Sequence, residues 1–109
     1  MSKITMITLE KLLEMKANED EFVLVDTLDK ESFNEGHLPG AINLPSESII
    51  GEADEKLGKQ DTIVTYCAGY DCPASTIAAR KLLDTGFSDV LDFKGGLEAW
   101  ANAGLEVET

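Results

Sequence analysis

Short apolar runs alternate with amphipathic stretches along the chain, and this alternation limits the fold more than any other feature of the sequence. The runs have the length and the β-branched residues typical of strands, and they predict strands at residues 3–7, 22–26, 41–45, 62–66 and 89–93. The stretches between them predict helices that begin after the capping residue Thr8 and that occupy residues 31–34, 46–59, 74–87 and 95–104. Strands that alternate with helices predict an α/β domain with a central, mostly parallel sheet of about five strands.

Composition excludes several classes of function. The 109 residues, 43% of them hydrophobic, suffice for one compact core and are too few for two, so we expect a single domain over residues 1–109. The formal net charge of −12 argues against nucleic-acid binding and against attraction to an anionic membrane, because both need a basic surface. The N-terminus lacks the apolar region of a signal peptide, and no apolar run approaches the roughly 20 residues of a membrane span. We therefore expect a cytoplasmic monomer that binds neither nucleic acid nor membranes.

The chain has two cysteines, Cys67 and Cys72. Without a signal peptide, two closely spaced cysteines make a poor disulfide framework, so we expect reactive chemistry instead. Cys67 directly follows the predicted strand 62–66, and sites in parallel sheets form where such a strand ends and the next helix begins. A cysteine that merely fills the core is the alternative. The position at the strand end favours Cys67 as a catalytic nucleophile.

The loop after Cys67 has the features of an anion-binding loop. Its backbone amides and the positive end of the following helix can point toward the sulfur, where they would stabilise a thiolate or a persulfide. Gly69 permits close backbone approach, Pro73 suits an early helical position, and Ser75 can cap the helix or donate to the anion. The candidate loop comprises Ala68, Gly69, Tyr70, Asp71, Cys72, Pro73, Ala74 and Ser75.

Two segments, VDTLDKESFNEGHLPGAINLP at residues 25–45 and VTYCAGYDCPASTIAARKLLDTGFSDVLDFKGGLEAW at residues 64–100, resemble single-domain rhodaneses, a family of sulfurtransferases. The likeness extends from about Leu9 to Leu105, which makes it more specific than a lone motif. It rests on Asp26 at a strand end, Phe33, the GHLPGA segment from Gly36 to Ala41, the cysteine loop, Gly95, Gly96 and Trp100. The resemblance implies a parallel sheet flanked by helices on both faces. It also implies that Cys67 takes a sulfane sulfur from a donor as a persulfide and passes it to a thiol or another nucleophilic acceptor, without a cofactor.

The sequence departs from the family pattern in three ways. The cysteine loop is about two residues longer than usual, and an arginine often found shortly after the strand-ending aspartate is replaced by Leu28. Residues 68–75 include no basic residue and include Asp71, whereas Arg80 lies further along the next helix and is expected at the surface. Thiosulfate is a dianion, so we expect it to be a weak donor and a less charged persulfide or polysulfide to be a better one.

Alternatives remain open for the two thiols. Cys72 is either a resolving thiol that closes a disulfide with Cys67 or a small apolar residue that turns inward. The protein could accordingly be a catalytically weak rhodanese-like module that binds a partner or senses redox state through both cysteines. A cysteine phosphatase or an arsenate reductase on a related loop would need an arginine six positions after Cys67, where Pro73 stands. Two thiols and His37, which is expected to be a structural turn residue, fall short of a four-ligand zinc site.

Overall fold

The computed structural model describes residues 4–109, which contain a five-stranded sheet in which all neighbouring strands are parallel. The strands are β1 (Thr5–Ile7), β2 (Val23–Asp26), β3 (Ile42–Asn43), β4 (Thr62–Tyr66) and β5 (Asp89–Phe93), in the spatial order β1-β5-β4-β2-β3. This confirms the predicted α/β class and parallel sheet. Residue 3, which the sequence placed in the first strand, lies outside the described residues.

Residues 4–109 contain five helices: four lie between successive strands, α1 (Leu9–Ala17), α2 (Lys30–Glu35), α3 (Ile49–Lys56) and α4 (Ala74–Asp84), and α5 (Gly96–Asn102) follows the last strand. Thr8 caps α1 as predicted, because its side chain accepts a hydrogen bond from the Lys11 amide at 3.1 Å. The third helix begins later than the expected residue 46. The amide of Ser46 is bonded to the Thr27 carbonyl instead, so this residue still belongs to the connection from the sheet. None of the described helices is long and apolar enough to cross a bilayer.

The third strand is shorter than the predicted span 41–45. The amide of Ala41 bonds to the Leu38 carbonyl in a turn, and Pro45 has no amide to donate to a neighbouring strand. Only Ile42 and Asn43 therefore pair with β2. Short apolar runs indicate where a strand lies better than where it ends.

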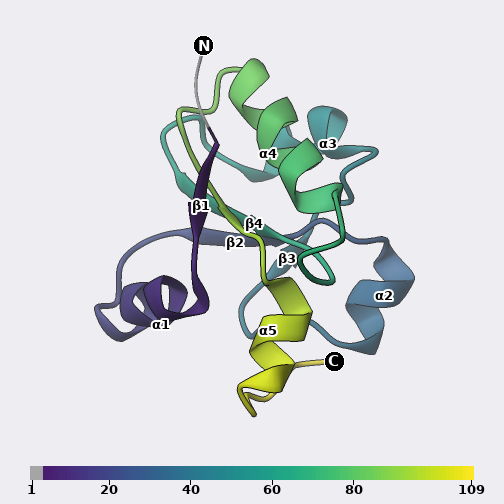
Figure 1. Cartoon of the computed structure of the whole chain (residues 1–109). Helices are drawn as coiled ribbons and strands as arrows, with labels where there is room; N and C mark the ends of the chain where they lie inside the picture. Colours follow the sequence, from purple (N-terminus) through teal and green to yellow (C-terminus); the bar gives the residue numbers. More distant parts are fainter. Residues whose placement is uncertain (1–3) are drawn as a thin grey trace.

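Helices cover both faces of the sheet, and each face has its own hydrophobic core (Figure 1). Alternate residues of the central strand β4 point to opposite faces, so Ile63 lies in one core and Val64 in the other. The first core is closed by α3 and α4, and the second by α1 and α5. Trp100 of α5 is 5% exposed and belongs to the second core.

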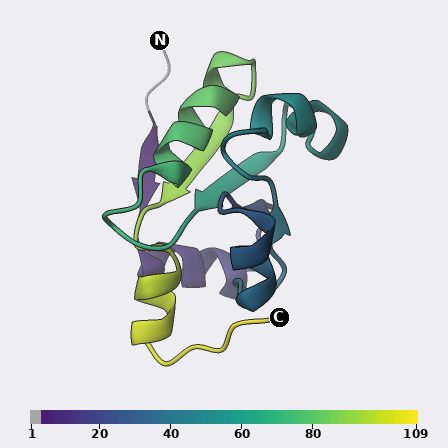
Figure 2. The same cartoon turned by 90° about the vertical axis from the view of Figure 1, so that its right-hand side faces the viewer.

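The strand register aligns the carboxyl ends of the three inner strands. Tyr66, the last residue of β4, is opposite Asp26 of β2 and Phe93 of β5. The residues that directly follow these strands therefore share one edge of the sheet. The loop from β4 to α4 lies beside the start of α5 at this edge (Figure 2).

Candidate active site

Cys67 follows the central strand β4 directly and is fully buried. Its thiol donates to the backbone carbonyl of Cys72 at 3.2 Å, and its sulfur lies 3.5 Å from Oγ of Ser75 in the first turn of α4. The structure thus brings together Cys67, Cys72 and Ser75 from the predicted loop. Pro73 immediately precedes α4, in the early helical region expected for it.

Buried hydrogen bonds hold the first turn of α4 against the sheet. The Thr76 hydroxyl donates to the carboxylate of Asp92 on β5 at 2.7 Å, and the Thr65 hydroxyl on β4 donates to the Ser75 carbonyl at 3.2 Å. Thr65 and Asp92 are fully buried and Thr76 is partly buried, so both bonds are largely shielded from solvent. They fix the position of Ser75 beside the Cys67 sulfur. Sequence reasoning did not identify Asp92, although a carboxylate within a predicted buried strand is a signal that a partner must exist.

Cys72 is partly exposed and lies in a tight turn, in which its amide donates to the Gly69 carbonyl at 3.0 Å. The side of the loop toward solvent forms an open pocket of about 330 Å³. The residues that line this pocket are Ala68, Gly69, Tyr70, Asp71, Cys72 and Glu98. Cys67 does not line it, so the two cysteines differ in their access to solvent.

The two thiols also differ in acidity. Burial raises the pKa of Cys67, and the hydrogen bond that it makes with the Cys72 side chain raises it further, while Ser75 opposes both effects. Burial acts in the same direction on Cys72, but the hydrogen bonds from the Cys67 thiol and from the amides of Ala68 and Ala74 outweigh it and lower the pKa. We expected the loop amides to favour a thiolate on Cys67. In the structure the amides of Ala68 and Ala74 favour a thiolate on Cys72, whereas the amide of Ser75 favours one on Cys67.

Lys94 is a site residue that sequence reasoning missed. It follows β5 and its ammonium donates to the Cys72 carbonyl, while its charge helps to lower the pKa of the Cys72 thiol. Residues 68–75 contain no basic residue, as the sequence shows, yet the neighbouring strand supplies one. The available signal was the position of Lys94 at the end of a predicted parallel strand, which places it at the same sheet edge as Cys67.

The start of α5 is hydrogen-bonded to the start of the cysteine loop. The amide of Leu97 donates to the Cys67 carbonyl at 3.0 Å, and the amide of Glu98 donates to the Ala68 carbonyl at 2.8 Å. Gly96 has a φ of +54°, and a Cβ at this position would lie 2.2 Å from the Cys67 carbonyl oxygen. The glycine therefore allows the two backbones to approach closely enough for these bonds. This explains Gly96, the second glycine of the pair that the sequence singled out.

Asp26 and Tyr66 form a buried hydrogen-bonded pair at the carboxyl ends of β2 and β4. The Tyr66 hydroxyl donates to Asp26 at 2.8 Å and accepts from the Leu38 amide at 3.0 Å, and the Leu28 amide also donates to Asp26 at 2.9 Å. Burial raises the pKa of Asp26 despite these two hydrogen bonds. The carboxylate thus connects the strand end to the two loops that follow β2 and α2.

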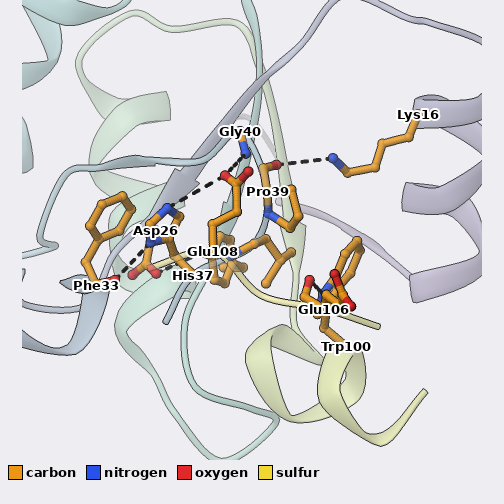
Figure 3. A network of polar contacts seen from close by, with 11 residues as sticks. Lys16, Asp26, Phe33, His37, Pro39, Gly40, Trp100, Glu106 and Glu108 are labelled. Carbon is orange, nitrogen blue, oxygen red and sulfur yellow. Dashed lines mark hydrogen bonds and ion pairs between the residues drawn. The ribbon is translucent and has the colours of Figure 1, made fainter. Parts of the chain in front are cut away.

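His37 lies in a polar network with the C-terminal segment, which Figure 3 shows beside Asp26. Its ring stacks on Phe33 at a centroid distance of 3.8 Å, and its backbone pairs with Glu108 through two hydrogen bonds of 2.9 and 2.8 Å. Neither contact involves the cysteine loop. Arg80, the nearest basic residue after the loop, makes an ion pair with Asp84 on α4 at 3.9 Å. Both residues have structural partners, as their sequence context suggested.

Comparisons with known proteins agree with this geometry. Residues 8–103 match the family model described as the rhodanese-like domain. The chain is 35% identical over 106 residues to the thiosulfate sulfurtransferase GlpE of Shewanella oneidensis, with 94% of this chain and 98% of that protein covered. It is 38% identical over 88 residues to the HTH-type transcriptional regulator Rv0324 of Mycobacterium tuberculosis, covering 81% of this chain but only 38% of the regulator.

Solved structures show the same fold. The Alr3790 protein from Anabaena sp. superposes with a TM-score of 0.84 at 32% identity, covering 94% of this chain and 90% of that one. The BH2092 protein from Bacillus halodurans superposes with a TM-score of 0.86 at 33% identity, covering 95% and 76%. Because the family model spans nearly the whole chain and the fold agrees throughout, the chain belongs to the rhodanese-like domain family.

Proposed function

We propose that the protein is a sulfurtransferase that moves a sulfane sulfur through a persulfide on Cys67. The observation that carries this proposal is the position of the Cys67 thiol between the end of β4 and the first turn of α4, where Ser75 faces the sulfur at 3.5 Å. Burial raises the pKa of Cys67, and the hydroxyl and amide of Ser75 oppose this effect, so the same groups would stabilise a persulfide anion there. The likeness to a thiosulfate sulfurtransferase over 98% of that protein's length supports this class of reaction.

Sulfur uptake begins with the removal of the Cys67 proton. Ser75 faces the sulfur at 3.5 Å and favours the thiolate that remains when this proton is lost. The Cys67 thiolate then attacks the sulfane sulfur of the donor, a sulfur–sulfur bond forms, and the remainder of the donor leaves with the bonding electrons. An acceptor nucleophile reverses this exchange by attacking the outer sulfur, which regenerates the Cys67 thiolate.

The cysteine loop must move for the donor to enter. Cys67 is fully buried, whereas Ala68 and Tyr70 of the covering loop are exposed, with Tyr70 63% accessible. Displacement of this loop would open a route from the pocket beside it to the sulfur. The loop is fastened to α5 by the Leu97 and Glu98 amides, so we place the movement in residues 69–72 rather than at the strand end.

We further propose that thiosulfate is a weak donor. The pocket on the cysteine loop carries the carboxylates of Asp71 and Glu98, and a second pocket of about 290 Å³ that reaches Ala74 carries Asp29 and Glu47. Lys94 supplies positive charge, but its ammonium is engaged by the Cys72 carbonyl. A donor with one negative charge meets less repulsion from these carboxylates than a dianion does.

Peptide mass spectrometry after exposure to a sulfane donor tests the function. We expect one added sulfur atom on the peptide that contains Cys67, in protein whose Cys72 is replaced by serine so that the persulfide persists. Cys67→Ser should take up no sulfur and should keep the fold, because the change is nearly isosteric and a serine hydroxyl forms no stable persulfide. Sulfur transfer by Cys67→Ser at the parent's rate would contradict the assignment.

A second function is favoured by the burial of Cys67 and by its hydrogen bond to Cys72: a redox-sensing or binding module that uses the two thiols without sulfur transfer. This module would show no added sulfur with any donor. It would instead form a disulfide reversibly when treated with a mild oxidant. The same mass measurement therefore separates the two functions.

A further inference from the structure

We propose that Cys72 attacks a persulfide on Cys67, closes a disulfide between the two cysteines and releases the sulfane sulfur as hydrosulfide. This inference rests on the proposed function, since the persulfide must first form. In the step, the Cys72 thiolate attacks Sγ of Cys67, a bond forms between the two cysteine sulfurs, and the bond between Sγ and the outer sulfur breaks. The outer sulfur leaves as HS⁻ with the electron pair, so the sulfane sulfur is reduced while the Cys72 sulfur is oxidised.

The loop geometry places Cys72 next to its target. The carbonyl of Cys72 accepts the Cys67 thiol at 3.2 Å, and each of the two thiols shifts the pKa of the other. The turn closed by the Cys72 amide and the Gly69 carbonyl at 3.0 Å folds the loop back over the strand end. The two cysteines therefore already lie on facing segments, and disulfide closure needs movement of the loop only.

Lys94 holds this arrangement in place. Its ammonium donates to the same Cys72 carbonyl that accepts the Cys67 thiol, so the backbone of Cys72 is held from both β4 and β5. The positive charge also favours the thiolate form of Cys72, which is the form that attacks a persulfide. An alternative role for Cys72 as an inert apolar residue does not account for its partly exposed side chain and the lowered pKa of its thiol.

Burial gives Cys72 an advantage over an external acceptor. A persulfide on Cys67 would form beneath the loop, since Cys67 has no accessible surface. A thiol from outside reaches it only when the loop opens, whereas Cys72 belongs to that loop and stays within reach when it closes. The closed state thus favours release of hydrosulfide, and the open state favours transfer to an acceptor.

The reaction also limits turnover. In the disulfide form neither cysteine can accept another sulfur, so a dithiol reductant must restore both thiols before the next cycle. With a dithiol present, the protein would reduce sulfane sulfur to hydrosulfide continuously. The added activity is therefore a sulfane-sulfur reductase activity that depends on a dithiol.

Single-turnover loading with benzenethiosulfonate tests the inference, because this singly charged donor delivers one sulfur and releases benzenesulfinate rather than sulfide. In the absence of free thiols, we expect the parent protein to release one equivalent each of sulfinate and hydrosulfide and to lose the mass of two hydrogens. Cys72→Ser and Cys72→Ala should release sulfinate, release no hydrosulfide and accumulate a persulfide on Cys67. Cys67→Ser should do none of these.

The outcomes separate the inference from the proposed function. Release of sulfinate by the parent with a stable persulfide on Cys67, and neither disulfide nor hydrosulfide, would overturn the resolving role and leave the sulfurtransferase intact. The absence of both sulfinate and added sulfur in parent and variants would overturn both. Sulfur carried by Cys72 in the Cys67→Ser variant would also overturn both, because Cys72 would then be the residue that accepts sulfur.

Discussion

At the scale of single residues, the two cysteines show how strongly position changes the chemistry of one side chain. Cys67 is fully buried and Cys72 is partly exposed, although only four residues separate them. Burial and the neighbouring thiol raise the pKa of Cys67, whereas hydrogen bonds and the charge of Lys94 lower that of Cys72. The residue that the sequence favours as the nucleophile is thus the less acidic and less accessible thiol in the resting protein.

This difference predicts the order of alkylation. Iodoacetamide should modify Cys72 faster than Cys67 near neutral pH, because Cys72 is both more exposed and more often a thiolate. The pH midpoint of its reaction should lie below that of an ordinary cysteine. Lys94→Met should move this midpoint upward by removing a positive charge, while Lys11→Met on α1 should leave it unchanged. Peptide mass spectrometry at a series of pH values measures both effects, and an unshifted midpoint in Lys94→Met would refute the role given to Lys94.

A second prediction concerns Asp71. This exposed carboxylate lines the pocket at the cysteine loop, so Asp71→Asn should raise the rate of sulfur uptake from thiosulfate, most clearly at low salt. The rate with the singly charged benzenethiosulfonate should rise less. Glu10→Gln, which removes the same charge from the exposed first turn of α1, is the matched control. An unchanged thiosulfate rate, or a parent protein that prefers thiosulfate, would show that the local carboxylates do not govern donor choice.

At the scale of secondary-structure elements, the site depends on how closely α5 approaches the end of β4. The amides of Leu97 and Glu98 bond to the Cys67 and Ala68 carbonyls, so the first turn of the helix is completed by the cysteine loop. Gly96 makes this approach possible. The first turn of α4 is held in a similar way by the bond between Thr76 and Asp92. The cysteine loop is therefore positioned by two helices that pack on opposite faces of the sheet.

Two glycine substitutions test this arrangement. Gly96→Ala should lower the free energy of unfolding by about 1–3 kcal/mol, since its Cβ would collide with the Cys67 carbonyl at a backbone angle that favours glycine. It should also slow persulfide formation by displacing the loop. Gly51→Ala on α3, where a Cβ would meet nothing within 4 Å, should instead stabilise the protein by about 0.5–1 kcal/mol. Urea denaturation provides both values, and equal effects of the two substitutions would refute the close-approach argument.

At the scale of the whole molecule, the sheet separates two hydrophobic cores. The site lies at the carboxyl ends of the central strands, where helices from both faces of the sheet contact the cysteine loop. One core contains α3 and α4, and the other contains α1 and α5. Trp100 closes the second core, and its indole donates to the Glu106 carbonyl at 2.8 Å. Because α5 also bonds to the cysteine loop through the Leu97 and Glu98 amides, a change in the packing of this core is expected to shift that loop.

Trp100→Ala should lower the free energy of unfolding by about 3–5 kcal/mol, because it removes a large side chain that is 5% exposed. Trp100→Phe keeps most of the apolar contact and loses the indole hydrogen bond, so its cost should be smaller, about 1–2 kcal/mol. Guanidinium melts followed by circular dichroism measure both. If Trp100→Ala had the same free energy of unfolding as the parent protein, the stability of the second core would not depend on α5.

The sequence by itself determined the elements that depend on neighbouring residues: the alternation of strands and helices, the cap at Thr8, and the placement of Cys67 at the end of a buried strand. These follow from periodicity and local hydrogen bonding, which are readable along the chain. Only the tertiary structure decided that β5 lies beside β4, and therefore that Lys94 reaches Cys72 from 22 residues away. It also decided which thiol is buried. Charge, burial and hydrogen bonding at a sulfur depend on distances through space, and the order of strands in the sheet sets those distances rather than the order of residues in the chain.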